Sequence, residues 1–284
     1  MFEAPLSKPL ERRAHLLALG HACQRQRDRL ISVAFDYFSV DPNVLGIFVS
    51  GSLAAGSSDA YSDIDLRVVV RHERHSWFVE HRRELPQQWP GFLFNEWMPG
   101  TGHCVSHFQP FNKLDVFYLD TEKLTPSPWY RLPMIILYDP EKIVTGLVDR
   151  SKELNFAVTT DEIDISISKG LAAAHETYRR AKRGELFYSQ TLLDELRQHI
   201  MQSDDWLNDR TPETTVLARF DRRSSPDVQQ ALTDSYCQYD ADMILSALNR
   251  LLVIYRAQVV GLHQQFKLNR PVENDLAAID VCGG

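Results

Sequence analysis

The chain has 284 residues, which is enough for two domains of ordinary size, each with its own hydrophobic core. Its formal net charge is −7, and a protein that binds a long polyanion needs a basic track, so nucleic acid is not expected to be the main partner. The apolar runs fall far short of the roughly 20 residues that cross a bilayer. The N-terminal stretch carries charges where a secretory signal needs an apolar segment. We therefore expect a cytoplasmic protein without a membrane span.

The distribution of charge indicates a class of partner, and the spacing of the cysteines indicates the state of the thiols. Residues 1–150 contain 16 Lys and Arg against 18 Asp and Glu, and residues 151–284 contain 15 against 20. The more acidic second half suits a cationic small molecule. The four cysteines are isolated and form no C-x-x-C pair, so we expect reduced thiols and neither a disulfide framework nor a cysteine zinc site. Nothing in the sequence sets the oligomeric state.

The first half of the chain mixes helix and strand patterns. Helical spacing of apolar residues predicts a helix over residues 9–40, with a weak point near Gly20, and Asp41-Pro42-Asn43 ends it. A second helix is expected from about Arg74 to Leu85. Strands separated by turns and a helix indicate a mixed α/β sheet. The β-rich runs that predict its strands are residues 44–50, 64–70, 91–98, 103–109, 113–120 and 134–139.

From about Asp161 onward the pattern is almost wholly helical. Helices are expected over residues 159–184, 186–209 and 239–266, the first opening on a capping Thr with an acidic first turn and ending at Gly184. The predicted fold class is therefore α/β (α+β). An N-terminal domain with a mixed β-sheet flanked by helices, residues 1–150, is followed by a C-terminal helical bundle domain, residues 151–284.

The stretch VSGSLAAGSSDAYSDIDLRVVV, residues 49–70, places two carboxylates in an otherwise aliphatic strand. Because alternate side chains of a strand share a face, Asp63, Asp65 and Arg67 point one way and the aliphatic residues between them point the other. Two carboxylates about 6 Å apart repel by roughly 3 kcal/mol at an effective dielectric constant near 20. Arg67 could offset this repulsion, and magnesium could offset it better because it prefers carboxylate and phosphate oxygens.

The loop before this strand supports the magnesium interpretation. Gly51 and Ser52 follow the strand at residues 44–50, and small residues up to Gly56 would let backbone N–H groups approach a phosphate. A Gly-Ser turn alone is usually only a turn. Its distance from the two aspartates makes the combination more specific.

The pattern Gly51-Ser52, Gly56, Ser62-Asp63-x-Asp65-Leu66 resembles the signature of the polymerase-beta-like nucleotidyltransferase superfamily. An α/β domain followed by a helical bundle is similar to the aminoglycoside and lincosamide nucleotidyltransferases. The resemblance implies that Asp63 and Asp65 bind catalytic magnesium ions. It also implies that the nucleotide is bound through Gly51, Ser52 and Ser62.

A third carboxylate is expected on a later strand, and Asp115 is the candidate. In the superfamily that this chain resembles, such a residue either completes the metal site or acts as general base on the acceptor hydroxyl, and both roles stay open. Glu96, on another predicted strand, is the rival base.

The resemblance implies a magnesium-dependent nucleotidyltransferase, an enzyme of the EC 2.7.7 type that moves a nucleoside monophosphate, AMP from ATP being favoured, onto a hydroxyl of a small molecule. An aminoglycoside-type antibiotic is the leading acceptor, which would make this an antibiotic-resistance enzyme. One alternative is a transferase that modifies a protein side chain, in regulatory adenylylation or toxin neutralisation. Another is a catalytically silent nucleotide-binding protein.

Other polar clusters give weaker signals. His72/His75 and His103/His107 could mimic a zinc site, but the second pair lies in a strand-like segment where residues four apart are too distant for one ion. The charge runs YRRAKRG and QSDDWLND are expected to be solvated helix faces. The alternative is that bundle residues reach the triphosphate or hold a cationic acceptor, the candidates being Lys169 and Lys182 for the first and Asp204, Asp205 and Trp206 for the second.

Overall fold

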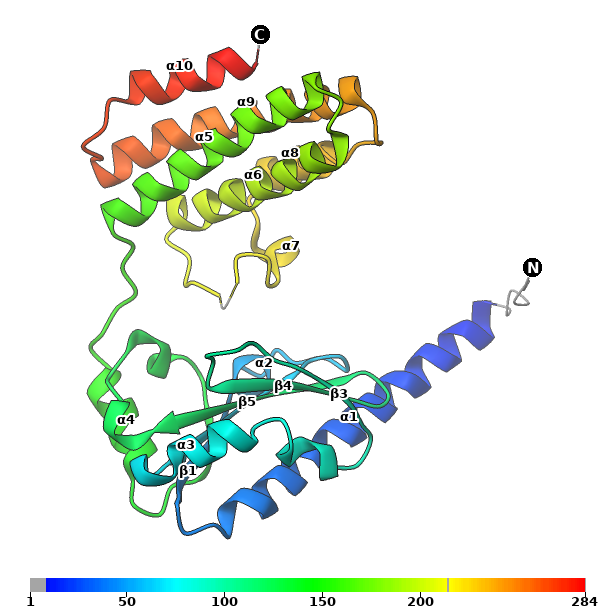
Figure 1. Ribbon diagram of the computed structural model, residues 1–284, viewed down its shortest axis with the longest axis vertical. Coiled ribbons are helices and arrows are strands. Elements are labelled where there is room, and N and C mark those ends of the chain that lie inside the picture. Colours follow the sequence, from blue (N-terminus) through cyan, green and yellow to red (C-terminus); the bar gives the residue numbers. More distant parts are fainter. Residues whose placement is uncertain (1–8, 214, 284) are drawn as a thin grey trace. The chain divides into compact units, whose positions relative to one another are not determined.

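The computed structural model describes residues 9–213 and 215–283, and the chain divides into two compact units. Figure 1 shows a sheet with helices in the first unit and helices alone in the second. The first unit ends at Asn155 and the second begins at Phe156, five residues after the expected boundary. The mixed sheet and the helical second half confirm the predicted fold class. That each unit folds as a separate domain stays a prediction.

A six-stranded sheet forms the centre of the first unit. Its strand order is β3-β4-β5-β2-β1-β6, and only β2 and β5 run parallel among its described neighbours. The elements of this unit are α1 (Pro9–Ser39), β1 (Val44–Ser50), α2 (Gly51–Ala54), β2 (Ile64–Val70), α3 (His72–His81), β3 (Phe92–Glu96), β4 (His103–Phe108), β5 (Asn112–Asp120), β6 (Ile135–Tyr138) and α4 (Ile143–Ser151), with 3-10 turns at Leu85–Gln88, Thr121–Lys123 and Pro128–Arg131.

The two faces of this sheet differ in their cover. Helices α1 and α3 pack on one face, where Ile64, Leu66, Leu114 and Val116 are buried. On the opposite face, α4 and neighbouring loops cover β1 and the far end of β2. The rest of that face, over β2, β5, β4 and β3, carries half-buried side chains. We call it the open face of the first unit.

The long helix α1 runs without a break, so the weak point expected at Gly20 is wrong. A Cβ on Gly20 would lie 3.2 Å from the Cβ of Ala60, so glycine at this position allows the helix and the β1–β2 connection to approach closely. The helix ends at Ser39, and the Asp41 carboxylate then accepts a hydrogen bond of 2.8 Å from the backbone N–H of Asn43. The expected stop at Asp41-Pro42-Asn43 is confirmed.

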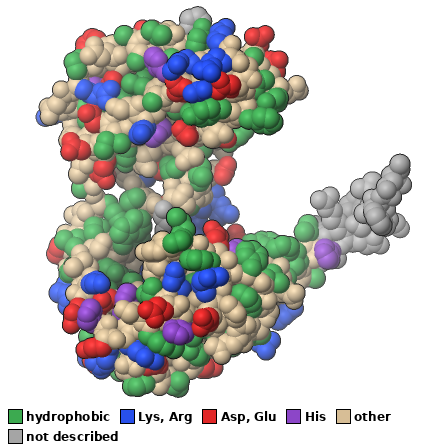
Figure 2. All heavy atoms as spheres, in the orientation of Figure 1, with side chains coloured by type: hydrophobic (Ala, Val, Ile, Leu, Met, Phe, Trp, Pro, Cys, Tyr) green, Lys and Arg blue, Asp and Glu red, His purple; other side chains and the backbone are tan. Residues whose placement is uncertain are grey.

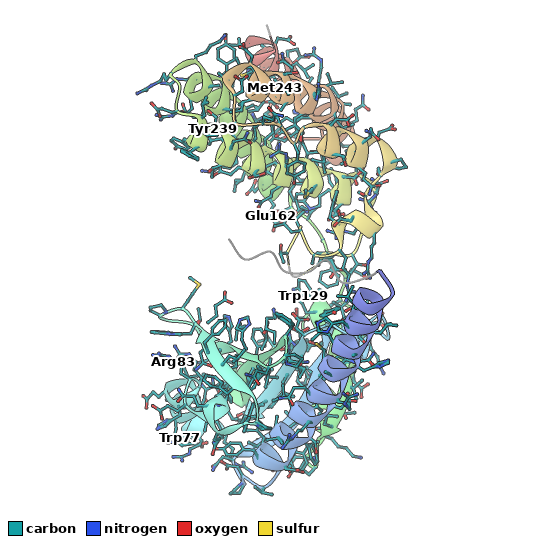
Figure 3. All side chains as sticks on the ribbon, turned by 90° about the vertical axis from the view of Figure 1, so that its right-hand side faces the viewer. Trp77, Arg83, Trp129, Glu162, Tyr239 and Met243 are labelled. Atoms are coloured by element: carbon teal, nitrogen blue, oxygen red, sulfur yellow. The ribbon has the colours of Figure 1, made fainter. Side chains whose placement is uncertain are left out.

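The second unit is built from helices α5 (Thr160–Lys182), α6 (Leu186–Leu207), α7 (Phe220–Arg223), α8 (Pro226–Asp234), α9 (Ala241–Phe266) and α10 (Val272–Cys282). Glu162 lies in the first turn of α5 (Figure 3), and its carboxylate and the Thr159 hydroxyl form a capping box there. The three long helices pack together around a shared apolar core. The shorter α8 and α10 were not predicted, because each has too few turns to show a clear period.

Helix α9 has the length and apolar composition of a membrane span, which the sequence expectation of short apolar runs did not anticipate. One face of this helix is fully buried within the bundle, including Ile244, Leu248, Leu251 and Tyr255. Its apolar residues recur every three or four positions, as on the core face of a packed helix.

The acidic run of α6 is not a solvated face, so that expectation is wrong for two of its residues. Asp204 and Asp205 are almost fully buried. The Arg210 guanidinium lies 2.6 Å from Asp204, and that of Arg223 lies 2.8 Å from Asp205. Both carboxylates therefore attach the segment after α6 to the bundle through ion pairs. Arg210 and Arg223 already occupy the positions at these carboxylates where a cationic acceptor would bind.

This network predicts a large effect of Arg223 on stability. Removing one partner of a buried ion pair leaves an uncompensated charge and costs about 3–5 kcal/mol. Because Asp205 keeps a second contact of 3.2 Å with Arg210, we expect Arg223→Met to lower the free energy of unfolding by about 3 kcal/mol, measured by urea unfolding followed by circular dichroism. The matched control is Arg179→Met, which breaks an exposed pair with Glu176 and should cost less than about 1 kcal/mol. Equal losses in the two variants would contradict this account.

Candidate active site

The candidate site lies on the open face, where β2 and β5 begin. Because these strands are parallel and in register, Asp65 pairs directly with Asp115. Asp63 lies one residue before β2 and therefore outside the strand in which it was expected. Residues on this side of the sheet form rows across neighbouring strands. The rows are His107 and Lys113, then Val105, Asp115, Asp65 and Ser50, then His103, Phe117, Arg67 and Phe48, of which Phe48 lies under the cover of α4.

A lysine joins two of the three predicted carboxylates. The Lys113 ammonium lies 2.8 Å from Asp63 Oδ2 and 3.3 Å from Asp115 Oδ2. Burial alone would lower the pKa of Lys113, but hydrogen bonds and charge interactions with Asp63 and Asp115 raise it. Lys113 was not among the predicted site residues. Its position two residues before Asp115 on a strand, and hence on the same face, was the signal that could have found it.

Arg67, which the sequence offered as the neutralising residue, has different partners. Its guanidinium lies 4.7 Å from the centroid of the Phe117 ring and donates a hydrogen bond to the Ser50 hydroxyl. Lys113 thus contacts Asp63 and Asp115 directly. Arg67 lies in the next row, where burial lowers its pKa and the charges of Asp65 and Asp115 oppose that lowering.

The Asp115 carboxyl is largely buried, with 14% of its side chain exposed. Burial raises its pKa to about 6, with Asp63 and Asp65 acting in the same direction and Lys113 opposing them. One of its oxygens, Oδ1, is buried without a hydrogen-bond partner among the described residues. Such a carboxyl can take up a proton near neutral pH.

The Gly-Ser turn lies directly beside these carboxylates. Gly51 begins the short helix α2 with φ +68°, and a Cβ there would lie 2.1 Å from Asp65 Oδ2. The Ser52 side chain is buried and its hydroxyl has no hydrogen-bond partner among the described residues. The structure thus brings Gly51 to Asp65 and buries the Ser52 hydroxyl beside them; a nucleotide contact of Ser52 stays a prediction.

Ser62 has contacts inside the loop. Its hydroxyl accepts a hydrogen bond of 2.8 Å from the backbone N–H of Asp59, whose carbonyl in turn accepts one of 2.6 Å from Arg27. Asp59 Oδ1 also accepts from the N–H of Tyr61. These bonds fix the loop that leads to Asp63, and a nucleotide contact of Ser62 stays a prediction.

The rival base Glu96 lies farther away. It pairs across the sheet with Val105, which pairs with Asp115, so all of β4 stands between the two carboxylates. Its side chain is 71% exposed and lies 3.5 Å from His107. The geometry therefore favours Asp115.

The histidines also have separate partners. His107 stacks on Phe94 with ring centroids 4.3 Å apart, and His103 stacks on Phe117 at 5.0 Å. His72 contacts Asp120 at 2.9 Å, and His75 contacts the carbonyl of Tyr118. Neither pair of histidines converges on one point.

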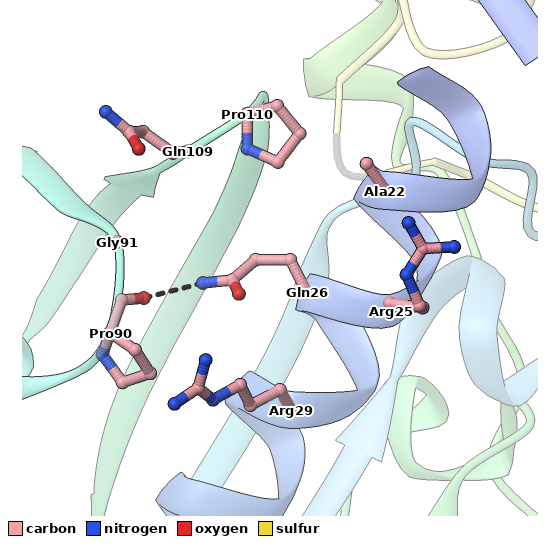
Figure 4. A pocket seen from close by; sticks show the side chains of 8 residues that line it. All are labelled: Ala22, Arg25, Gln26, Arg29, Pro90, Gly91, Gln109 and Pro110. Atoms are coloured by element: carbon pink, nitrogen blue, oxygen red, sulfur yellow. Dashed lines mark hydrogen bonds between the residues drawn. The ribbon is translucent and has the colours of Figure 1, made fainter. Parts of the chain in front are cut away.

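Two cavities lie elsewhere in the first unit. One of about 530 Å³ lies between α1 and the loops at residues 90–91 and 109–110, where Gln26 donates a hydrogen bond of 2.5 Å to the Pro90 carbonyl (Figure 4). The other, of about 490 Å³, is mainly apolar and is lined by residues of α1 with Ala60 and Tyr61. Neither contains a predicted site residue.

Charges of both signs are interspersed on the surface. On the face drawn in Figure 2, lysine and arginine side chains form small groups beside aspartates and glutamates. That face carries no continuous basic track of the kind that binds a polyanion.

Three solved structures are similar to this chain. An aminoglycoside 6-adenyltransferase from Bacillus subtilis has 12% identity and a TM-score of 0.43, covering 90% of this chain and 98% of that one. A nucleotidyltransferase-like protein from Exiguobacterium sibiricum has 14% identity and a TM-score of 0.41, covering 90% and 87%. A CCA-adding enzyme in complex with ATP has 12% identity and a TM-score of 0.28, covering 95% and 79%.

No family model matches the chain, and no curated protein sequence matches it. The functional conclusion depends on the chain's own carboxylates.

The contact between Gly51 and Asp65 predicts a specific sensitivity. Gly51→Ala places a non-glycine residue at positive φ, which costs about 1–2 kcal/mol, and also forces the Asp65 side chain to move, which adds about 1–3 kcal/mol. The control is Gly56→Ala, because Gly56 has nearly the same φ, +66°, but nothing within 4 Å of its Cβ position. We expect the larger loss of unfolding free energy at Gly51, measured by urea denaturation. Equal losses in the two variants would show that the positive φ alone accounts for the need for glycine at residue 51.

The pKa of Asp115 predicts an unusual dependence of stability on pH. Because its folded pKa of about 6 lies above the ordinary 3.8, this group contributes stability that is full below about pH 4 and is lost as the pH rises through about 6. Two pKa units correspond to about 3 kcal/mol. Asp115→Asn should therefore be more stable than the wild type by up to about 3 kcal/mol at pH 8, with the difference vanishing near pH 4.

Asp120, at the other end of β5, provides the control for this measurement. Burial acts to raise its pKa, but hydrogen bonds from His72, the Glu122 backbone and Lys123 outweigh burial and lower it. Its ionised form thus stabilises the fold above the unfolded pKa, so Asp120→Asn should lose stability at pH 8. A stability loss in both variants would contradict the raised pKa of Asp115.

Proposed function

We propose that this protein is a magnesium-dependent nucleotidyltransferase. The observation that carries this proposal is that Asp63, Asp65 and Asp115 gather near the N-terminal ends of two parallel strands, in which Asp65 pairs with Asp115 and Lys113 contacts both Asp63 and Asp115, over an aliphatic core on the other face. Carboxylates that repel one another need a cationic partner in the working state. Beside them lies a Gly-Ser turn whose Ser52 hydroxyl has no hydrogen-bond partner within residues 9–213 and 215–283.

The residues fit magnesium in their chemistry. Among residues 9–213 and 215–283, no three side chains are already arranged as a metal site. However, the donors are all carboxylate oxygens, which magnesium prefers. The Lys113 ammonium lies between the Asp63 and Asp115 carboxylates, in a position that a metal ion could take. Asp115 Oδ1 has no hydrogen-bond partner among the described residues. Asp63 and Asp65 would hold the ion, which when bound neutralises phosphate charge and stabilises the leaving pyrophosphate.

The chain's own groups then account for the transfer step. The Asp115 carboxylate accepts the proton of the acceptor hydroxyl, a role for which its pKa of about 6 is suited. The hydroxyl oxygen forms a bond to the α-phosphorus of a nucleoside triphosphate, and the bond from that phosphorus to the bridging oxygen breaks to release pyrophosphate. The Ser52 hydroxyl donates to a phosphate oxygen, and Gly51 lets the turn lie close to the Asp65 carboxylate.

ATP is the nucleotide, and a small molecule carrying a hydroxyl is the acceptor. Residues 151–284, which include the whole second unit, have 15 Lys and Arg against 20 Asp and Glu, which favours a cationic acceptor such as an aminoglycoside-type antibiotic. Antibiotic resistance would then be the biological role. Asp204 and Asp205 are not offered as acceptor ligands, since arginines hold both.

The test is transfer from labelled ATP with magnesium onto a panel of aminoglycosides and lincosamides, read by mass spectrometry. Asp63→Asn and Asp65→Asn keep the side-chain shape but lose the charge that holds the metal. We expect each of these variants to lose several kcal/mol of transition-state stabilisation, which corresponds to a transfer rate reduced by about 1000-fold or more. The matched control is Asp149→Asn, at an exposed aspartate of the same unit, which should keep full activity.

The remaining outcomes separate the alternatives. Magnesium-dependent ATP binding by calorimetry without any product would indicate a protein side chain, or a metabolite outside the panel, as acceptor. Absence of nucleotide binding would indicate a catalytically silent protein. Loss of magnesium affinity in Asp115→Asn would place this residue among the metal ligands. Full activity of both Asp63→Asn and Asp65→Asn would overturn the proposal.

A further inference from the structure

The position of Lys113 has a consequence for how the site takes up its metal, an inference that rests on the proposed function. Its ammonium contacts Asp63 and Asp115 at 2.8 Å and 3.3 Å. In the proposed reaction Asp63 would have to turn toward a divalent cation, and Asp115 toward that cation or the acceptor hydroxyl. The Lys113 ammonium and a metal ion cannot bind the same carboxylate oxygens at the same time, so they compete for them.

We propose that Lys113 is an internal counterion that holds the carboxylates together before substrate binds and is displaced by the metal–nucleotide complex. A metal ion alone must remove the ammonium and leave it without a partner beside a positive ion. A metal ion that arrives with a triphosphate offers the displaced ammonium new anionic oxygens. Lys113 thereby makes metal binding depend on the nucleotide.

The side chain is suited to this movement. A lysine ammonium is a compact charge on a flexible four-carbon stem, and Lys113 is 36% exposed, so it can leave its partners without moving the strand. Arg67, the neighbouring cation of the open face, is instead fixed over Phe117 and hydrogen-bonded to Ser50. Lys113 is therefore the cation that can be exchanged.

The test measures binding of Mn²⁺, a spectroscopic substitute for magnesium, to the full chain by electron paramagnetic resonance. We compare the wild type with Lys113→Met, which keeps much of the stem but not the charge. A single charge about 5 Å from a divalent ion changes affinity on the order of tenfold even in water. Without nucleotide, Lys113→Met should therefore bind Mn²⁺ on the order of tenfold more tightly. A non-hydrolysable ATP analogue should raise Mn²⁺ affinity less in this variant than in the wild type.

The matched control is Lys123→Met. Lys123 pairs with Asp120 at the other end of β5, so its removal should leave both Mn²⁺ affinities unchanged. Unchanged or weaker Mn²⁺ binding by Lys113→Met would overturn the inference. If Asp63→Asn still abolished both Mn²⁺ binding and transfer in that case, the proposed function would stand without it. Absence of Mn²⁺ binding by the wild type, with or without the ATP analogue, would overturn both.

A second measurement avoids the risk that Lys113→Met does not fold. In the wild type, lysine amines are acetylated briefly with acetic anhydride and the peptides are quantified by mass spectrometry. Addition of Mn²⁺ alone at saturating concentration should increase acetylation of Lys113 several-fold, because the displaced amine loses its carboxylate partners. Lys123 in the same sample should not change. Equal acetylation of Lys113 with and without Mn²⁺ would contradict displacement.

Discussion

The parallel pairing of β2 with β5 is the constraint on which the rest of the site depends. The strands start at the same end of the sheet, and the register sets Asp65 opposite Asp115. Their alternate residues, such as Leu66 and Val116, are fully or almost fully buried against α1 and α3. Because each apolar side chain stabilises the fold by about 1.5–3 kcal/mol on burial, the core outweighs the repulsion between the carboxylates. Slipping the register by one residue would expose that core.

The charges of the site show how a stable fold carries an unfavourable cluster. Burial and like charges act together on Asp115, and Lys113 relieves only part of the cost. Such stored free energy is typical of sites whose chemistry needs a perturbed group. In the second unit, by contrast, the buried Asp204 and Asp205 are matched by two arginines and serve the fold. Aspartates thus have two roles in this protein, one in the candidate site and one in stabilising the fold. The two roles differ in how many cationic side chains lie beside the carboxylates.

The sequence predicted most of what periodicity and motif spacing determine. Alternation along β2 and β5 was enough to assign the faces and to pair Asp65 with Asp115 as candidates. Lys113 was missed because a lysine on a half-exposed strand looks like ordinary surface until its partner strand is known. The burial of Asp204 was missed because its partner, Arg210, lies in an irregular segment whose path no local pattern records. Long-range charge pairing is the part that required coordinates.

The close approach of Gly51 to Asp65 also limits which substitutions this site can accept during evolution. With 2.1 Å between the Asp65 carboxylate and the place of a Cβ at residue 51, the effect of a substitution at either position depends on what occupies the other. A larger residue at 51 becomes tolerable only after the side chain at 65 has shrunk, and by then the carboxylate is gone. The two positions are therefore epistatic: loss of the aspartate would remove the steric part of the constraint on residue 51, while the positive φ would still favour glycine there.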